Sequence, residues 1–179
     1  MLYRVTTDTE REVLTSRGCH AESWERLLVS EDFRAEQLRN VRFEGYVTIG
    51  SNTRIIDSTI SNYVIGSNCV IDDVLRMECR HSTTFGEGTR VAAVNENGGR
   101  AILIFRELSS QIAYLMTMMR NRTAMVERLQ SLVMERAEKH KASMGRVGDN
   151  SSVVGARFIR EVAIEESCTI EGTSHLENG

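Results

Sequence analysis

Apolar residues recur about every six positions over much of this chain, which predicts short strands joined by corners. The pattern is an apolar residue, Gly, any residue, Asn or Gly, two further residues and a second apolar residue. Copies occupy residues 49–55, 65–71, 85–91 and 147–153, and a decayed copy with Glu in place of Gly occupies residues 164–170. A six-residue step fits neither the 3.6-residue period of a helix nor the period of two of a strand. It fits a coil of three short sides and about 18 residues.

Coils of this kind stack at the strand spacing of about 4.8 Å, and each backbone group then pairs with the coil above or below. The inward apolar residues form columns along the axis. Gly followed by a small or amide residue suits corners that need a positive φ angle. An antiparallel meander with glycine turns is the alternative, but a meander has no reason to keep a six-residue step. We therefore expect a mainly β fold of about five coils, one for each copy of the repeat.

The first 40 residues carry no repeat and predict a small α cap on the first coil. Thr7 and Glu10 have the spacing of a capping box, so a helix from about residue 8 should end at Gly18. Ser23 is placed to cap a second short helix that carries Trp24. Such a cap is expected because a bare coil end exposes unpaired strand edges.

A helical insertion is predicted to divide the coils into a first part, residues 41–105, and a second part, residues 144–179. Over residues 106–143 the apolar side chains fall at helical spacing on both sides of Asn121. Two helices of about 15–18 residues each follow from this spacing. They lie along one flank of the coils or project as an arm towards a partner subunit. Their methionines are expected to pack in a core, although methionine-rich surfaces also bind adaptable partners.

These segments resemble the hexapeptide-repeat family, whose fold is a left-handed parallel β-helix. The resemblance covers residues 41–104 and 145–177, and the left hand is implied by the resemblance alone. Within that superfamily the chain is most similar to an uncharacterised bacterial group of long proteins, a domain of unknown function loosely labelled as sugar-nucleotide or acyl transferases. The absence of proline is a departure, since hexapeptide corners often use it.

Three stretches carry the resemblance to the bacterial group, at residues 40–43, 95–100 and 108–115. Because the resembling proteins are long, and because the sequence stops about where a further coil would begin, we expect a fragment of a longer protein.

Composition and charge remove several classes of function. The net charge of −3 lacks the excess of positive charge that is typical of nucleic-acid-binding proteins, and no apolar run has the length of a membrane span. The four cysteines form no C-x-x-C pair and have no histidines at zinc-finger spacing, so we expect isolated buried thiols and no metal site. Without an export signal, a reducing cytoplasm is the expected compartment.

The resemblance implies a histidine that acts as general base, and His81 is the candidate because it lies in the longer loop between coils. The alternative is an ordinary exposed loop histidine. Asn62, between two copies of the repeat, is expected to form an inward hydrogen-bond ladder at a corner.

A second candidate is the string of residues 95–100, in which backbone N–H groups and a guanidinium would hold an anion and a carboxylate would serve as a base. Its ligand-binding residues are Asn95, Glu96, Gly98, Gly99 and Arg100. The alternative is a turn that leads into a strand at residues 101–105.

Two functions remain open. The first is a transferase, with acyl-CoA as the possible co-substrate and a sugar nucleotide or similar small molecule as acceptor. The second is a non-catalytic binding or assembly module of a larger β-helix protein. The resemblance also implies a homotrimer with small-molecule ligands in the clefts between subunits. Fold analogy alone is a weak warrant for either function.

Overall fold

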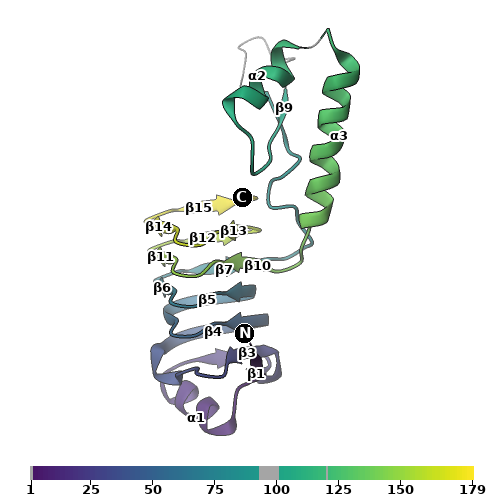
Figure 1. Ribbon diagram of the computed structural model, residues 1–179. Coiled ribbons are helices and arrows are strands. Elements are labelled where there is room, and N and C mark those ends of the chain that lie inside the picture. The colour runs from purple at the N-terminus through teal and green to yellow at the C-terminus, as the bar shows by residue number, and fades with distance from the viewer. Residues whose placement is uncertain (1, 93–100, 120) are drawn as a thin grey trace. The chain divides into compact units, whose positions relative to one another are not determined.

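The computed structural model describes residues 2–92, 101–119 and 121–179, and the chain divides into two compact units. Unit 1 comprises residues 1–82 and 143–179, and unit 2 comprises residues 83–142. Unit 1 is built on a large sheet with one short α-helix, and unit 2 contains two further α-helices (Figure 1). The expectation of a mainly β protein is confirmed.

The strands of unit 1 are β1 (Tyr3–Val5), β2 (His20–Ala21), β3 (Leu27–Ser30), β4 (Leu38–Ile49), β5 (Arg54–Ile65), β6 (Val70–Asp72), β7 (Arg76–Glu78), β10 (Gly145–Val147), β11 (Ser152–Val154), β12 (Phe158–Arg160), β13 (Ala163–Ile164), β14 (Thr169–Glu171) and β15 (His175–Glu177). Its helical elements are α1 (Asp8–Ser16) and two single 3₁₀ turns, η1 (Trp24–Arg26) and η2 (Ala35–Gln37). Unit 2 contains β8 (Arg90–Val91), β9 (Ile102–Leu103), α2 (Ser110–Met118) and α3 (Thr123–His140).

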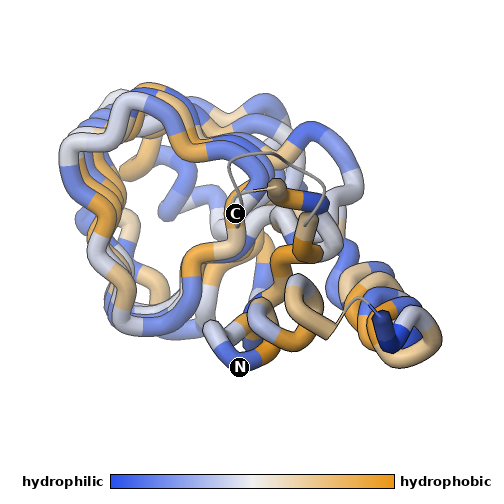
Figure 2. The backbone as a smooth tube through the Cα atoms, turned by 90° about the horizontal axis from the view of Figure 1, so that it is seen from above, coloured by the Kyte–Doolittle hydropathy of each residue, from blue (hydrophilic) through white to orange (hydrophobic). Residues whose placement is uncertain are grey.

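Parallel pairing of successive turns organises the sheet into three ladders. The first ladder joins β3, β4, β5, β10 and β13, and the second joins β4, β5, β6, β11 and β14. The third ladder joins β2, β4, β5, β7, β12 and β15. The strands β4 and β5 have 12 residues each, bend round the corners and contribute to all three ladders. In Figure 2 the turns of unit 1 overlie one another, and hydrophobic residues recur on the same sides.

The register places apolar residues of successive turns directly above one another. Three inward columns result, and all their side chains are apolar, many of them β-branched. Full burial of one such side chain stabilises the folded state by about 1.5–3 kcal/mol relative to exposure to water. The columns are Leu38, Ile55, Ile71, Val153 and Ile170; Phe43, Ile60, Met77, Ile159 and Leu176; and Ile49, Ile65, Val147 and Ile164.

Left-handed backbone conformations mark the corners at one-turn intervals. Asn52 and Asn68, 16 residues apart, and Asn150 have φ angles of 52°, 55° and 58°. Their side chains stack: the Asn52 amide donates to Asn68 Oδ1 over 3.0 Å, and the Asn68 amide donates to Asn150 Oδ1 over 3.3 Å. Asparagine is the ordinary non-glycine residue for this conformation because its short polar side chain bonds locally. The amide ladder therefore joins the corners of three turns.

Asn62 confirms the structural role that its sequence position predicts. Its φ angle is 53°. Its Oδ1 accepts the Tyr46 N–H at 3.0 Å, and its amide donates to the Cys79 carbonyl oxygen at 2.9 Å. One side chain thus binds the backbone of the turn below and of the turn above.

The amino-terminal segment agrees with the sequence prediction in α1 but not beyond it. Thr7 and Glu10 form the expected capping box, and α1 ends before Gly18, whose φ angle is 79°. The predicted second helix is wrong, since only the 3₁₀ turn η1 forms and Ser23 makes no side-chain cap. The next residues form β3, which pairs in parallel with β4, because pairing with the first long strand outweighs a weak helical preference.

The copy of the repeat at residues 85–91 also departs from the prediction. It does not join the parallel ladders: its strand β8 pairs antiparallel with β9, inside unit 2. Gly86 and Gly88 have φ angles of 80° and 83° and lie in a turn just before β8. The non-repeating unit therefore begins at residue 83, well before the predicted residue 106.

Unit 2 contains the two helices predicted for the insertion. α3 has 18 residues, as expected, but α2 has only nine. Ile102, Leu103, Met116 and Val133 form a small core of their own. Core packing is confirmed for Met116, whereas Met118 and Met134 are about half exposed, at 51% and 46%.

Tyr63 fixes the point where the chain re-enters the stack after unit 2. Its side chain is fully buried, and its hydroxyl donates to the Val162 carbonyl oxygen at 3.0 Å and accepts the Val162 N–H at 3.3 Å. Gly145, the first residue of β10, is directly opposite Tyr63 in the ladder. A Cβ atom there would lie 2.2 Å from Tyr63 Cζ, so the ring occupies the space of the missing side chain.

Replacing Gly145 with Ala should therefore lower the free energy of unfolding, by about 2–3 kcal/mol, because the methyl group overpacks the core against the ring. Urea unfolding followed by circular dichroism measures the loss. In a Tyr63→Ala background the same substitution should cost less than about 1 kcal/mol, since the obstructing ring is gone. An equal cost in both backgrounds would contradict the account of this contact.

Candidate functional site

The structure leaves the predicted catalytic histidine without a partner among the described residues. His81 lies in unit 1 after β7, its side chain is exposed, and its imidazole makes no hydrogen bond or ion pair with the part of the chain that the structure describes. Its backbone is held, since the Cys79 thiol donates to the His81 carbonyl oxygen at 3.4 Å. The position is accessible, but the imidazole is not oriented by a neighbouring side chain.

The second predicted group lies outside the described residues. Asn95, Glu96, Gly98, Gly99 and Arg100 fall within residues 93–100, which the structure does not describe. The described residues therefore bring none of them together with His81.

A network of arginines and glutamates on the outward side of the third ladder is the candidate functional site. Side chains alternate along a strand, so Arg76 and Glu78 of β7 both point outward while Met77 points into the core. The register sets Phe158 beside Arg76 and Arg160 beside Glu78. The parallel stacking thus collects charged residues from segments 82 positions apart onto one face.

Glu78 is the centre of this network. Its side chain is only 3% exposed. Its Oε2 accepts from Arg76 Nε at 2.6 Å, and its Oε1 accepts from Arg160 Nε at 2.8 Å. A third guanidinium, that of Arg80, contacts the same Oε1 at 2.5 Å. Charge-assisted hydrogen bonds of this length are the strong class of hydrogen bond.

The neighbouring residues hold the arginines in place. Arg76 also donates to Glu44 Oε2 at 2.6 Å, and the guanidinium of Arg160 lies 5.1 Å from the centre of the Phe158 ring. Glu161, whose φ angle is 47°, accepts the backbone N–H of Arg80 through Oε1 at 3.1 Å. The three guanidinium groups are therefore held by contacts within the chain.

The electrostatics of Glu78 follow from these contacts. Burial by itself raises the pKa of this carboxyl, but the hydrogen bonds from Arg76 and Arg80 outweigh burial and hold the pKa below its usual value. Glu78 is thus a carboxylate at neutral pH and a counter-ion for the arginines, not a proton donor.

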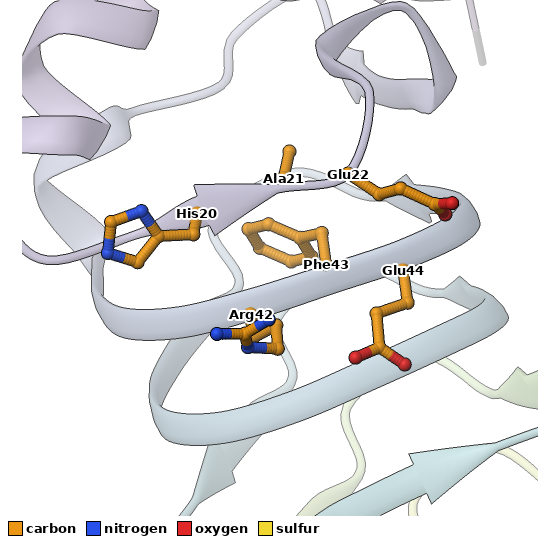
Figure 3. Close-up of a pocket in the computed structure, with 6 residues that line it drawn as sticks. All are labelled: His20, Ala21, Glu22, Arg42, Phe43 and Glu44. Carbon is orange, nitrogen blue, oxygen red and sulfur yellow. The ribbon is translucent and has the colours of Figure 1, made fainter.

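A shallow groove of about 390 Å³ lies on the same ladder, nearer the amino terminus, where β2 pairs with β4. Figure 3 shows His20 and Arg42 towards one end and Glu22 and Glu44 towards the other. Glu44 connects the groove to the network through its bond to Arg76. The polar side chains that line it are all partly or wholly exposed, so the groove does not enclose a reacting group.

The cysteines do not add a redox or metal centre to the described part of the chain. All four are free, and three of them are buried. Burial raises the pKa of the Cys19, Cys69 and Cys79 thiols, which keeps them protonated and unreactive. Among the described residues no group of three or more His, Cys, Asp or Glu side chains has the geometry for a metal ion.

Sequence reasoning missed the network although part of its signal was visible. Residues 76–80 alternate charged and uncharged side chains, a period of two that sets three charges on one face of a strand. The partner Arg160 is 82 residues away from Glu78, and only the register of the stacked turns brings it there. No short sequence motif encodes that pairing.

The fold and the network define a mainly β protein whose parallel strands stack turn on turn and carry a charged face. The chain belongs to the family described as domain of unknown function DUF4954, whose model matches residues 3–59 and 53–179. A protein of Treponema pallidum (strain Nichols), described as uncharacterized, is 24% identical over 217 residues. That alignment covers 98% of this chain but only 30% of the relative's length. No solved structure matches, and none of the described helices is long and apolar enough to span a membrane.

Replacing Glu78 with Gln keeps the shape of the side chain and removes the charge that three guanidinium groups share. The free energy of unfolding at pH 7 should fall by about 2 kcal/mol, less than for a wholly buried ion pair because the arginines reach water. Since the folded pKa is depressed, this stabilisation is present above the unfolded pKa and is lost as the pH falls through the folded value. The difference between wild type and variant should therefore shrink below pH 4.5, the ordinary pKa of glutamate.

Urea unfolding at several pH values measures this effect. The control is Glu135→Gln, which removes the carboxylate of an exposed pair with Arg128 at 3.2 Å and should cost less than about 0.5 kcal/mol. A Glu78→Gln variant no less stable than this control would show that the network contributes nothing to stability.

Proposed function

We propose that unit 1 is a left-handed parallel β-helix of the hexapeptide-repeat type. Three parallel ladders and left-handed corners one turn apart support this assignment, for example Gly155 and Gly172, which lie 17 residues apart. The six-residue step of the sequence supports it independently, and the left hand follows from the sequence resemblance. The free cysteines accord with a reducing cytoplasm as the compartment.

We propose that this β-helix works as a binding and assembly module that recognises a phosphate or carboxylate through Arg80 and Arg160. The carrying observation is that both guanidinium groups share one carboxylate oxygen, Glu78 Oε1. Each arginine has five N–H donors, so unused donors remain on side chains that are 50% and 26% exposed. A bound anion would relieve the repulsion between the two cations.

Preorganisation strengthens this proposal. Holding a long side chain for binding costs about 0.5–1.5 kcal/mol, and here Glu78 and Phe158 already hold the arginines in the free protein. The charged face also suits association with another protein chain, because arginine is enriched among the buried central residues of protein interfaces. A homotrimer with ligands in the clefts between subunits is the assembly that the resemblance favours. Because the chain spans 30% of the Treponema relative, the module would act within a larger protein.

A transferase remains the second candidate, with acyl-CoA as donor and a sugar nucleotide or similar small molecule as acceptor. The observation that favours it is that His81 follows Arg80 directly, so a phosphate held by Arg80 would bring the rest of the ligand near an exposed imidazole. It ranks second because a catalytic histidine is usually oriented by a third group, and His81 has none among the described residues.

Titration of the purified chain with acetyl-CoA and, in parallel, with UDP-N-acetylglucosamine tests the binding proposal. A ligand that binds only the folded state raises the melting temperature, by about 2.7 kcal/mol of stability at one hundred times its Kd. We expect a saturable rise with at least one of the two, and its loss in the Arg80→Ala, Arg160→Ala double variant. Arg39→Ala, which removes an exposed pair with Asp57 on another ladder, should keep the rise.

The same samples separate the two candidate functions. A transferase should transfer acetyl groups from acetyl-CoA and lose turnover in His81→Ala, whereas a binding module should bind without turnover. A well-folded chain that binds neither compound would contradict recognition of these phosphate-bearing ligands.

A further inference from the structure

The beginning and the end of unit 2 are tied together, which brings a carboxylate and a histidine side by side. Thr83 and Ala142 form an antiparallel bridge, with hydrogen bonds of 2.8 and 3.0 Å in the two directions. Glu87 lies just after this bridge in a tight turn, and His140 lies just before it as the last residue of α3. They are 53 positions apart in the sequence and adjacent in the fold.

The turn that carries Glu87 is held on several sides. The Glu87 carbonyl oxygen accepts the Thr84 hydroxyl at 2.7 Å, and the Glu87 N–H donates to the Thr84 carbonyl oxygen at 3.1 Å. The next residue, Gly88, lies close to α3, since a Cβ there would lie 3.1 Å from Met134 Sδ, tighter than an ordinary van der Waals contact. The turn therefore packs against α3, the helix that ends at His140.

The carboxylate orients the imidazole. Glu87 Oε2 lies 3.0 Å from His140 Nδ1, and the other oxygen, Oε1, accepts the backbone N–H of Arg106 at 3.3 Å. An ionised carboxylate only accepts hydrogen bonds, so a neutral His140 must carry its proton on Nδ1. The lone pair is then on Nε2, and the imidazole side chain is 41% exposed.

The burial of the carboxylate distinguishes this pair from an ordinary surface contact. The Glu87 side chain is only 12% exposed and has a second hydrogen-bond partner, which fixes its position. By contrast, His175 and Glu177 are 2.9 Å apart, but their side chains are 45% and 48% exposed. Solvent screens such an exposed pair and leaves it free to rearrange.

From this geometry we propose that Glu87 and His140 form a reactive site in unit 2, at which His140 Nε2 accepts acyl groups from small activated esters and Glu87 is the positioning residue. The site is independent of anion recognition by Arg80 and Arg160 and of any role for His81. An unprotonated, oriented and exposed imidazole nitrogen is the nucleophile that such chemistry requires.

The step is balanced without a further co-reactant. Nε2 forms a bond to the acyl carbon, the carbon–oxygen bond to the leaving group breaks, and the leaving alkoxide or phenolate departs with the electron pair. The carboxylate of Glu87, which accepts the hydrogen bond from the Nδ1 proton, compensates the positive charge that develops on the ring. Water then adds to the acyl-imidazolium and the bond between Nε2 and the acyl carbon breaks. The carboxylate and two protons are released, an alkoxide leaving group takes up one of these protons, and Nε2 is free again.

Two measurements on the full chain test the proposal. Nitrogen chemical shifts of the histidine side chains report the tautomer directly. We expect neutral His140 to be almost wholly in the Nδ1–H form in the wild type, and to shift towards the Nε2–H form, which is the usual one in water, in Glu87→Gln. The second measurement is the hydrolysis of p-nitrophenyl acetate, followed by release of p-nitrophenolate.

We expect the protein-dependent rate of hydrolysis to fall at least fivefold in His140→Asn and at least twofold in Glu87→Gln. The control is His175→Asn, which removes the exposed histidine of the other pair and should leave the rate within a factor of 1.5. If His140→Asn does not fold, Glu87→Gln, which conserves shape, still decides the outcome. A rate that is unchanged in Glu87→Gln, or a wild-type His140 that is not in the Nδ1–H form, would overturn the proposal.

Discussion

The register of the parallel ladders is the constraint on which the rest of the structure depends. Each turn must return the chain to its ladder in step, because a slip of one residue in a strand would move every inward side chain of that strand to the outside. Left-handed corners at equivalent positions of successive turns keep the strands in register here. Asn52 and Asn68 hold equivalent corners 16 residues apart, and their amides also bond to each other. Burial of the apolar columns then supplies the stability.

The same register builds the charged network around Glu78 and is kept across the long insertion of unit 2. Glu78 and Arg160 share an outward row because β7 and β12 are stacked in step, so a charged network arises without any local motif. The excursion of unit 2 leaves and re-enters the stack without loss of register, since Tyr63 reaches past Gly145 to the backbone of Val162. The charged network thus depends on long-range stacking more than on any single loop.

Much of the fold could be predicted because its physics is local and repeated. The six-residue step, the capping box at Thr7 and the corner role of Asn62 each depend on a few neighbouring residues. The failures concern pairing: residues 85–91 match the repeat, yet their strand β8 pairs antiparallel with β9 instead of joining the parallel ladders. The sites were harder to predict. Glu87 meets His140, and Glu78 meets Arg160, only after the chain has closed over long distances.

The most direct test of the account is the free energy of unfolding of two insertion variants, each with one extra alanine. One insertion lies between Val64 and Ile65, inside a strand that pairs on both sides, and the other lies between Asn121 and Arg122, ahead of α3. The account predicts that the first variant loses at least about 3 kcal/mol, because it breaks the register of a buried ladder, and that the second stays within about 0.5 kcal/mol of wild type. Equal stability of the two variants would contradict it.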